Sequence, residues 1–210
     1  YVCCHHEQAC AMAAESYFRL SGKIAAVNVT AGPGSINTLN GVFGAYVDSL
    51  GMIVISGQAK RETMARNYDI PLRQLGDQEV DIVSVVRPIT KYATVLQKPE
   101  KVKQVMEKAI FLATHGRPGP VWIDVPIDVQ AAPIDPEDLS AFDPKDIESI
   151  LNDRDLPANT KGEFDIMLAS EMCSAIVGIL EKLTSAVRPV VLAGSGVRIS
   201  GSKDIFLEVI

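Results

Sequence analysis

Apolar positions follow two alternating patterns along the chain, and together they predict an α/β fold. Near-continuous apolar runs bounded by turn residues are typical of strands buried on both faces. Such runs occupy residues 24–30, 52–58, 91–96 and 120–126. Between them, small or apolar residues recur at helical spacing, which predicts helices over residues 7–20, 35–50, 79–89 and 99–116. This order indicates a mainly parallel sheet flanked by helices.

Turn and cap residues set the expected limits of these helices. Ser35 is a suitable N-cap for the second helix, because its hydroxyl can accept a hydrogen bond from a first-turn amide. Gly22 and Gly116 are expected to end the first and last helices, and Pro88 is expected to end the third.

The composition changes after residue 130, which closes the first predicted domain, residues 1–130. Residues 131–164 are rich in proline and acidic residues and poor in large apolar ones, so we expect a surface linker. A helix over residues 165–183 and a strand over residues 189–194 predict the beginning of a second, central α/β domain, residues 165–210. The chain starts in what reads as a strand and ends within an apolar helical pattern. We therefore expect a piece of a longer protein, with an N-terminally incomplete first domain.

Composition and charge argue against several functional classes. Of the 210 residues, 47% are hydrophobic and 22% are charged, which is ordinary for a globular protein. The net charge of −6 and the lack of a Lys/Arg cluster argue against nucleic acid as a partner. No apolar run is long enough to span a bilayer, and no signal peptide is recognisable. Four cysteines, of which Cys3 and Cys4 are adjacent, do not form the pattern of a disulfide framework, so we expect a reduced, cytoplasmic protein.

Three short motifs suggest chemistry but also allow a purely structural interpretation. The CCHH cluster at residues 3–6 places possible metal ligands side by side, whereas zinc ligands usually stand about two to four residues apart, so packing is favoured. The GPGS turn at residues 32–35 can bind an anion at a helix N-terminus, or can simply let strand and helix pack closely. The stretch 194–201 lacks the full dinucleotide fingerprint, and Ser195 lies in no G-x-S-x-G frame.

Glu7 precedes an alanine-rich helix, where a first-turn glutamate commonly complements the helix dipole. The segments that follow it add a set of motifs in a fixed order, namely His6-Glu7-Gln8-Ala9, Thr30 to Asn37 with its TAGPGSIN sequence, and Ala45 to Ser49. This set resembles the pyrimidine-binding domain of thiamine-diphosphate-dependent enzymes, specifically the acetolactate synthase group. Residues 116–130 and 188–201 resemble, respectively, the segment that closes this domain and the start of the family's central domain.

The resemblance implies a role for individual residues. Glu7 matches the glutamate that hydrogen-bonds the aminopyrimidine ring of thiamine diphosphate and relays a proton. We expect its pKa to be raised by burial among small apolar groups such as Ala9 and Ala13. The resemblance also assigns Gly32, Pro33, Asn37 and Gln78 to cofactor binding, and His6, Asp77 and Lys91 to the substrate pocket.

Asp77 departs from the Phe-Gln pair of the family, in which the residue before the glutamine matched by Gln78 is usually phenylalanine. A charge in place of an aromatic ring leaves the acceptor substrate open. The resemblance implies a carboligase or decarboxylase acting on a 2-keto acid such as pyruvate, with transfer of the two-carbon unit to an acceptor. The alternatives are another thiamine-diphosphate-dependent 2-keto acid decarboxylase or oxidase, and a non-catalytic homologue that binds a partner.

The resemblance also implies that part of the cofactor site is absent from these residues. The family binds the diphosphate and Mg²⁺ through a Gly-Asp-Gly segment followed by an Asn-Asn pair, and this chain contains neither of them. We therefore expect Mg²⁺ ligands outside the chain, a site at the subunit interface of a homodimer or homotetramer, and no activity from the chain alone. Whether FAD is bound stays open.

Overall fold

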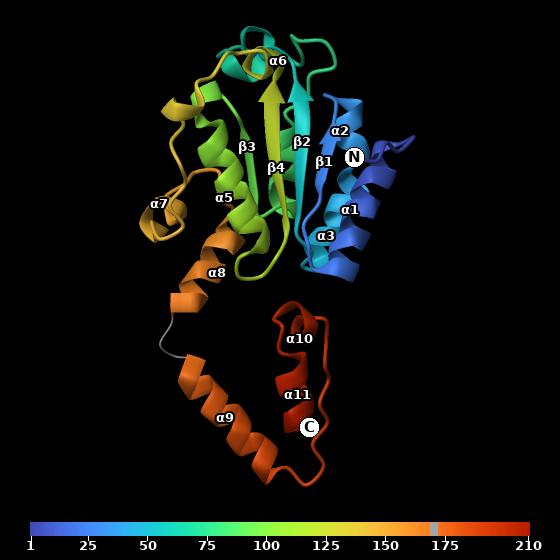
Figure 1. Cartoon of the computed structure of the whole chain (residues 1–210), viewed down its shortest axis with the longest axis vertical. Helices are drawn as coiled ribbons and strands as arrows, with labels where there is room; N and C mark the ends of the chain where they lie inside the picture. Colours follow the sequence, from blue (N-terminus) through green and yellow to red (C-terminus); the bar gives the residue numbers. More distant parts are fainter. Residues whose placement is uncertain (169–171) are drawn as a thin grey trace. The chain divides into compact units, whose positions relative to one another are not determined.

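The computed structural model describes residues 1–168 and 172–210 and divides the chain into two compact units, Tyr1–Phe164 and Asp165–Ile210. Within the described residues, the first unit contains a four-stranded, all-parallel sheet in the order β1-β2-β4-β3 (Figure 1). Its strands are β1 Ala26–Val29, β2 Met52–Gln58, β3 Tyr92–Val95 and β4 Pro120–Pro126. Because all four run the same way, their carboxyl ends meet at one edge of the sheet.

Helices cover both faces of this sheet, which confirms the predicted α/β fold. One face is covered by α1 Glu7–Ser21, α3 Leu39–Val47 and α4 Ile82–Val86, and the other by α5 Val102–Thr114. The other helices up to residue 168 are α2 Pro33–Asn37, α6 Ile127–Gln130, α7 Ile147–Leu151 and α8 Ala158–Leu168, which extends past the end of the first unit. Alternate side chains of the central strands enter two separate cores. Val54 and Trp122 pack with α1, α3 and α4, whereas Ile53 and Val121 pack with α5. Burial on both faces explains the unbroken apolar runs of β2 and β4.

The predicted strands of the first domain and most of its helices are confirmed within a few residues. Gly22 ends α1 with a φ of 70°, as its freedom to adopt a left-handed conformation predicts. Ser35 is not an N-cap, so that prediction is wrong. The helix begins two residues earlier at Pro33, which has no backbone N–H to satisfy and suits a first helical turn. The Ser35 hydroxyl instead donates a hydrogen bond of 2.9 Å to the Thr30 carbonyl.

Residues 131–164, expected to form a surface linker, lie within the first unit. Ile150 and Leu156 are buried in the same core as α5. Asp153 pairs with the Lys108 ammonium of α5. An acidic residue of this segment therefore pairs with a basic residue of the domain, although the acidic composition suggested exposure to solvent.

The second unit, Asp165–Ile210, is mainly helical in its described residues. It contains α9 Met172–Ser185, α10 Gly196–Ile199 and α11 Lys203–Val209, while residues 169–171 of the helix predicted over 165–183 lie outside the described residues. The prediction of a strand over residues 189–194 is wrong, because this segment pairs with no strand in the described part of the chain. Val190 and Leu192 are 92% and 97% exposed there. A strand is stable only where a neighbour satisfies its backbone N–H and C=O groups. No helix among the described residues has the length and apolar character needed to cross a membrane.

Candidate functional site

Glu7 is the first residue of α1, and its carboxylate meets the end of α2. Asn37, the last residue of α2, donates a hydrogen bond of 3.0 Å from Nδ2 to Glu7 Oε2. His6 is the N-cap of α1, and its Nδ1 accepts a hydrogen bond of 3.1 Å from the Gln8 amide. The pairing of Glu7 with Asn37 joins two residues that the sequence assigned to one site.

The expectation that burial raises the pKa of Glu7 is wrong for this structure. Ala9 and Ala13, the expected apolar surroundings, are exposed. The pKa of the Glu7 carboxyl is lowered by a hydrogen bond from its own backbone amide and then by the Asn37 amide. Desolvation opposes this lowering, and His6 adds the smallest contribution, which also lowers the pKa. A carboxylate in the first turn of a helix is favoured in its ionised form by the free N–H groups there. Glu7 is therefore a carboxylate whose position is fixed but whose surroundings remain open to water.

The GPG turn, residues 32–34, begins α2 and brings its backbone close to this carboxylate. A Cβ atom built on Gly34 would lie 2.6 Å from Thr30 Cγ2 and 3.5 Å from Glu7 Oε1. Gly32 has φ 57° and ψ −116°, a conformation that is almost confined to glycine. Pro33 then starts α2. Both glycines are buried, and the absence of their side chains lets the backbone of this turn pack beside Thr30 and Glu7.

A second loop, which follows β2, meets the GPG turn at Gly32. A Cβ atom on Gly32 would lie 2.3 Å from the backbone carbonyl oxygen of Gln78. Gln78 itself has a φ of 50°, which is uncommon for a residue with a side chain. The structure therefore brings together Glu7, Gly32, Asn37 and Gln78, which are separated by up to 71 positions in the sequence.

Close packing of α1 against α3 keeps Glu7 within reach of Asn37. A Cβ atom on Gly41 would lie 2.6 Å from Ala11 Cβ, so the two helices touch through small residues. At the far end of α1, Arg19 forms ion pairs with Glu15 at 2.7 Å and Asp48 at 2.6 Å. The Gly41–Ala11 contact and the Arg19–Asp48 ion pair hold α1 against α3, whereas the Arg19–Glu15 pair lies within α1.

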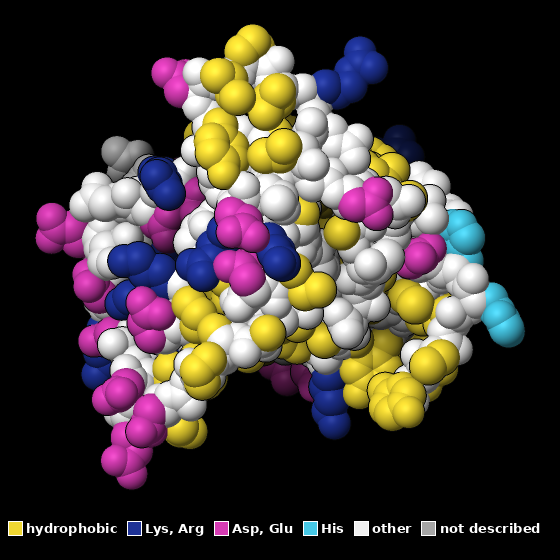
Figure 2. Space-filling model, turned by 90° about the horizontal axis from the view of Figure 1, so that it is seen from above, with side chains coloured by type: hydrophobic (Ala, Val, Ile, Leu, Met, Phe, Trp, Pro, Cys, Tyr) yellow, Lys and Arg dark blue, Asp and Glu magenta, His cyan; other side chains and the backbone are white. Residues whose placement is uncertain are grey.

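Two cavities open at this end of the first unit. One, of about 750 Å³, is lined by residues 1–7, by β1 and by residues of α1 that include Cys10, Ala13 and Tyr17. The other, of about 690 Å³, lies at the carboxyl ends of β1, β2 and β4, and Thr30, Gln58 and Asp77 contribute to its wall. Ligands of parallel α/β sheets bind outside the carboxyl ends of the strands. Figure 2 looks onto this end, with histidine side chains at one edge and acidic and basic side chains close together near its centre.

Lys91 does not join the other predicted residues. It precedes β3, at the amino end of the strands, and is 3% exposed. Its ammonium donates hydrogen bonds to the carbonyls of His115 at 2.8 Å and Arg117 at 2.5 Å and pairs with Glu163 at 3.0 Å. Desolvation lowers its pKa, and Glu163 opposes that effect. The geometry gives Lys91 a role in holding the turn between α5 and β4, at the opposite end of the sheet from Glu7.

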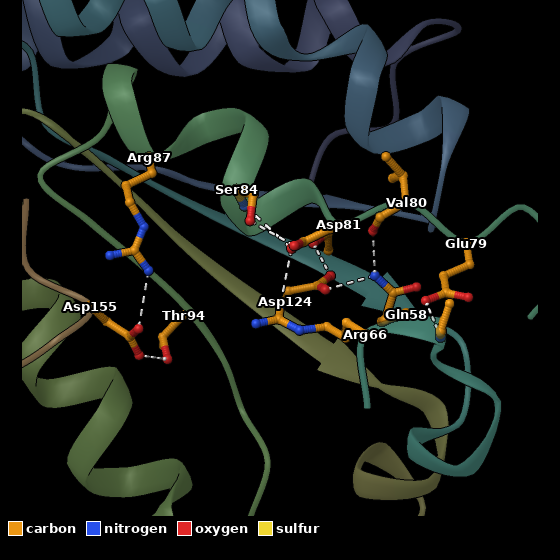
Figure 3. Close-up of polar contacts among 12 residues, drawn as sticks. Gln58, Arg66, Glu79, Val80, Asp81, Ser84, Arg87, Thr94, Asp124 and Asp155 are labelled. Atoms are coloured by element: carbon orange, nitrogen blue, oxygen red, sulfur yellow. Dashed lines mark hydrogen bonds and ion pairs between the residues drawn. The ribbon is translucent and has the colours of Figure 1, made fainter. Parts of the chain in front are cut away.

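Sequence reasoning missed a buried polar network at the carboxyl ends of β2 and β4 (Figure 3). Trp122 Nε1 donates to Ser56 Oγ at 2.8 Å, and the Ser56 hydroxyl donates to Asp124 Oδ1 at 2.6 Å. Gln58 Nε2 donates to Asp124 Oδ2 at 2.8 Å. The available signal was the presence of three polar residues in otherwise apolar strands, MIVISGQ and PVWIDVP. A buried polar side chain needs partners, so several of them in neighbouring strands indicate a network.

Asp124 gives the first testable prediction, which concerns stability against pH. Burial raises its pKa to about 6, and hydrogen bonds from Ser56 and Gln58 limit the rise. Its ordinary value is 3.8, so between these pH values the folded state binds more protons than the unfolded state. Protonation of Asp124 therefore contributes to the free energy of unfolding below about pH 4. This contribution, up to about 3 kcal/mol, is lost as the pH rises through about 6.

Urea denaturation followed by the fluorescence of Trp122, the single tryptophan, measures this effect in the first unit. Other carboxyl groups titrate in both proteins, so the wild type is compared with Asp124→Asn at each pH. From pH 4 to pH 7, the free energy of unfolding of the wild type should fall by about 3 kcal/mol relative to that of Asp124→Asn. A difference that stays constant with pH would contradict the raised pKa.

The sequence is similar to a known family and to several known proteins. Residues 1–85 match the family model described as the thiamine pyrophosphate enzyme, N-terminal TPP binding domain. A probable acetolactate synthase large subunit of Methanocaldococcus jannaschii is 33% identical over 99% of this chain and 31% of the relative. The acetolactate synthase large subunit of Buchnera aphidicola is 36% identical over 99% of this chain and 33% of the relative. The acetolactate synthase isozyme 3 large subunit of Escherichia coli is 31% identical over 100% of this chain and 32% of the relative. The chain spans about a third of the length of these relatives.

Proposed function

We propose that this chain, whose residues 1–85 belong to the family of N-terminal TPP-binding domains of thiamine pyrophosphate enzymes, is the pyrimidine-binding part of an acetolactate-synthase-like enzyme. The proposed reaction is decarboxylation of a 2-keto acid such as pyruvate and transfer of the two-carbon unit to an acceptor keto acid. The observation that carries the proposal is the Glu7 carboxylate, oriented by Asn37 at 3.0 Å beside the bare backbone of the GPG turn.

The residues around Glu7 fit the ring of thiamine diphosphate. Gly32 and Pro33 form a turn without bulky side chains, and Asn37 orients the carboxylate. We propose that these residues hold the aminopyrimidine and that Gln78 approaches from the second loop. When bound, thiamine diphosphate supplies the electron sink that decarboxylation of a 2-keto acid requires.

The proposed task of Glu7 is to hold and exchange a proton at its carboxylate. In the open site its pKa is lowered, so it is ionised and ready to accept a hydrogen bond. Covering the carboxylate by a ring and by a neighbouring protein surface removes water and disfavours the charged form. The pKa then moves toward the range in which a carboxyl group shares a proton efficiently. In this proposal, Glu7 is ionised when its carboxylate is exposed to water and becomes easier to protonate when the carboxylate is covered.

The remaining parts of the enzyme are proposed to lie outside residues 1–210. These are the ligands of the diphosphate and of Mg²⁺, and a second subunit that faces Glu7 in a homodimer or homotetramer. FAD binding, if it occurs, is also assigned to residues beyond this chain. The covered state of Glu7 depends on these parts, which is why we expect no activity from the chain alone.

The proposal is tested with the full-length protein, supplied with thiamine diphosphate and Mg²⁺. Pyruvate should be converted to carbon dioxide and acetolactate, and omission of thiamine diphosphate should abolish both products. Release of carbon dioxide with an aldehyde as the only other product would instead support a 2-keto acid decarboxylase. No consumption of pyruvate or of a longer 2-keto acid would overturn the proposal in favour of a non-catalytic homologue.

Asp77 gives a second prediction, on the choice of acceptor. It lines the cavity of about 690 Å³ and places a carboxylate where an aromatic ring would favour an apolar acceptor. In the full-length protein, Asp77→Phe should change the ratio of products from two competing keto acids by about 10-fold, roughly what removing an unfavourable charge–apolar contact supplies. Cofactor affinity should stay within about 2-fold, because the GPG turn is untouched. Asp69→Phe, which exchanges the same residue types on an exposed loop outside that cavity, is the control. An unchanged product ratio in Asp77→Phe would remove Asp77 from the pocket.

A further inference from the structure

Gln58, the last residue of β2, connects the buried network to the loop that carries Asp77 and Gln78. Its Nε2 donates two hydrogen bonds, one of 2.8 Å to Asp124 Oδ2 and one of 2.9 Å to the Val80 carbonyl. Its Oε1 accepts a hydrogen bond of 2.9 Å from the Ala59 amide. Gln58 is 5% exposed, and Asp124 is 1% exposed. One amide group therefore ties β4 to the loop (Figure 3).

The loop, defined here as residues 76–80, is fixed at its two ends. At its start, Glu79 accepts hydrogen bonds of 3.1 Å from the amides of both Leu75 and Gly76. A Cβ atom on Gly76 would lie 2.5 Å from Ala59 Cβ, so the loop sits directly on the residue after Gln58. At its other end, the Val80 carbonyl is held by Gln58. The exposed residues between these anchors are Asp77 and Gln78.

We infer that Gln58 and Asp124 are positioning residues that place the 76–80 loop over the proposed active site. Asp124 accepts one of the two hydrogens of the Gln58 amide, which fixes the direction in which the second hydrogen points. That second hydrogen reaches the Val80 carbonyl and sets how far Gln78 extends toward Gly32. The part of this inference that concerns substrates rests on the proposed function, whereas the part that concerns the loop does not.

Charged groups near the pair do not compete for this role. Arg66 and Asp81 face the network from the segment after β2 and the start of α4, and they pair with each other at 2.9 Å. Asp81 also accepts hydrogen bonds from the Ser84 amide and hydroxyl as the N-cap of α4. Arg66 and Asp81 are thus paired with each other and with the first turn of α4, while the Gln58 amide reaches into the loop.

The test uses three variants of this chain. Gln58→Glu replaces the amide donor by a carboxyl group and removes the hydrogen bond to the Val80 carbonyl. The double variant Gln58→Glu/Asp124→Asn reverses the donor and acceptor, so the new amide on β4 can donate to the new carboxylate on β2 while the Val80 carbonyl stays without its donor. Asp155→Asn is the matched control, because Asp155 accepts hydrogen bonds from Thr94 at 2.7 Å and Arg87 at 3.2 Å, away from the loop.

Two readouts separate positioning from stability. Hydrogen exchange of residues 76–80 should rise at least 10-fold in Gln58→Glu, relative to the exchange of α5 in the same protein. In the double variant the urea midpoint from Trp122 fluorescence should recover toward the wild type, while loop exchange stays fast. Asp155→Asn should leave loop exchange unchanged. Recovery of slow loop exchange in the double variant, or equal loop exchange in Asp155→Asn and Gln58→Glu, would overturn the inference.

The same variants in the full-length protein test the substrate part. Gln58→Glu and the double variant should both raise the KM for the acceptor keto acid about 10-fold, with kcat changed less than about 3-fold. An acceptor KM that matches the wild type in the presence of fast loop exchange would show that the loop does not place the acceptor. If the wild type consumes no keto acid, the proposed function fails, and the exchange experiment still decides the positioning role.

Discussion

Replacing Gly32 with alanine is expected to destabilise the first unit by about 3 kcal/mol or more and to displace the second loop. Two independent effects act at this position. The backbone of Gly32, at φ 57° and ψ −116°, is strained for any residue with a Cβ, which costs about 1–3 kcal/mol. The added methyl group would also lie 2.3 Å from the Gln78 carbonyl oxygen, and relieving such overpacking costs about 1–3 kcal/mol.

Gly22→Ala separates these two effects. Gly22 also has a positive φ, of 70°, but a Cβ there would meet no atom within 4 Å. This control should cost only about 1 kcal/mol, the strain of the left-handed conformation alone. Urea denaturation followed by Trp122 fluorescence compares the two variants in the same unit. Equal losses for Gly22→Ala and Gly32→Ala would show that the contact between Gly32 and Gln78 does not constrain the turn.

The strands of the first domain could be predicted because burial on both faces leaves an unmistakable pattern. β2 and β4 match the expected residues 52–58 and 120–126 in full. The same reasoning failed at residues 189–194, where an equally apolar run forms no strand. An apolar run indicates that burial is favourable. A strand also needs neighbouring strands to satisfy its backbone hydrogen bonds, and these neighbours are a property of the assembled sheet.

The candidate site shows a similar division. Glu7, Gly32, Asn37 and Gln78 could be named from ordered motifs, and the structure places them together through the contacts of α1, α2 and the second loop. Lys91 could not be separated from them by sequence alone. Its position is fixed by the direction of β3, which sends the residue before the strand to the opposite end of the sheet.

The pKa of Glu7 was predicted in the wrong direction for a physical reason. Alanine-rich sequence around a carboxylate suggests burial, but Ala9 and Ala13 are exposed, and Ala13 lines the same open cavity as Glu7. Desolvation is then weak, and hydrogen bonds to the ionised form dominate. The buried carboxyl group with a raised pKa is Asp124, which the sequence reasoning did not consider.

Replacing Glu7 with glutamine in the full-length protein is expected to give the largest loss of activity. Glutamine keeps the size of the side chain and an oxygen that can accept the Asn37 hydrogen bond, but it cannot take up or release a proton. A positioned acid–base group contributes about 100- to 10,000-fold, so kcat with pyruvate should fall by at least about 100-fold. Thiamine diphosphate should still bind within about 10-fold of the wild-type affinity in a calorimetric titration, because the ligands of its diphosphate are unchanged.

Glu15→Gln is the matched control for this prediction. Glu15 lies two turns along the same helix and pairs with Arg19 at 2.7 Å, so its replacement removes a charge from α1 without reaching the GPG turn. Its kcat should stay within about 2-fold of the wild type. If Glu7 served only to complement the dipole of α1, both variants would turn over pyruvate at nearly the wild-type rate and differ only slightly in stability. A large loss of kcat confined to Glu7→Gln, with cofactor binding retained, assigns the proton transfer to this carboxylate.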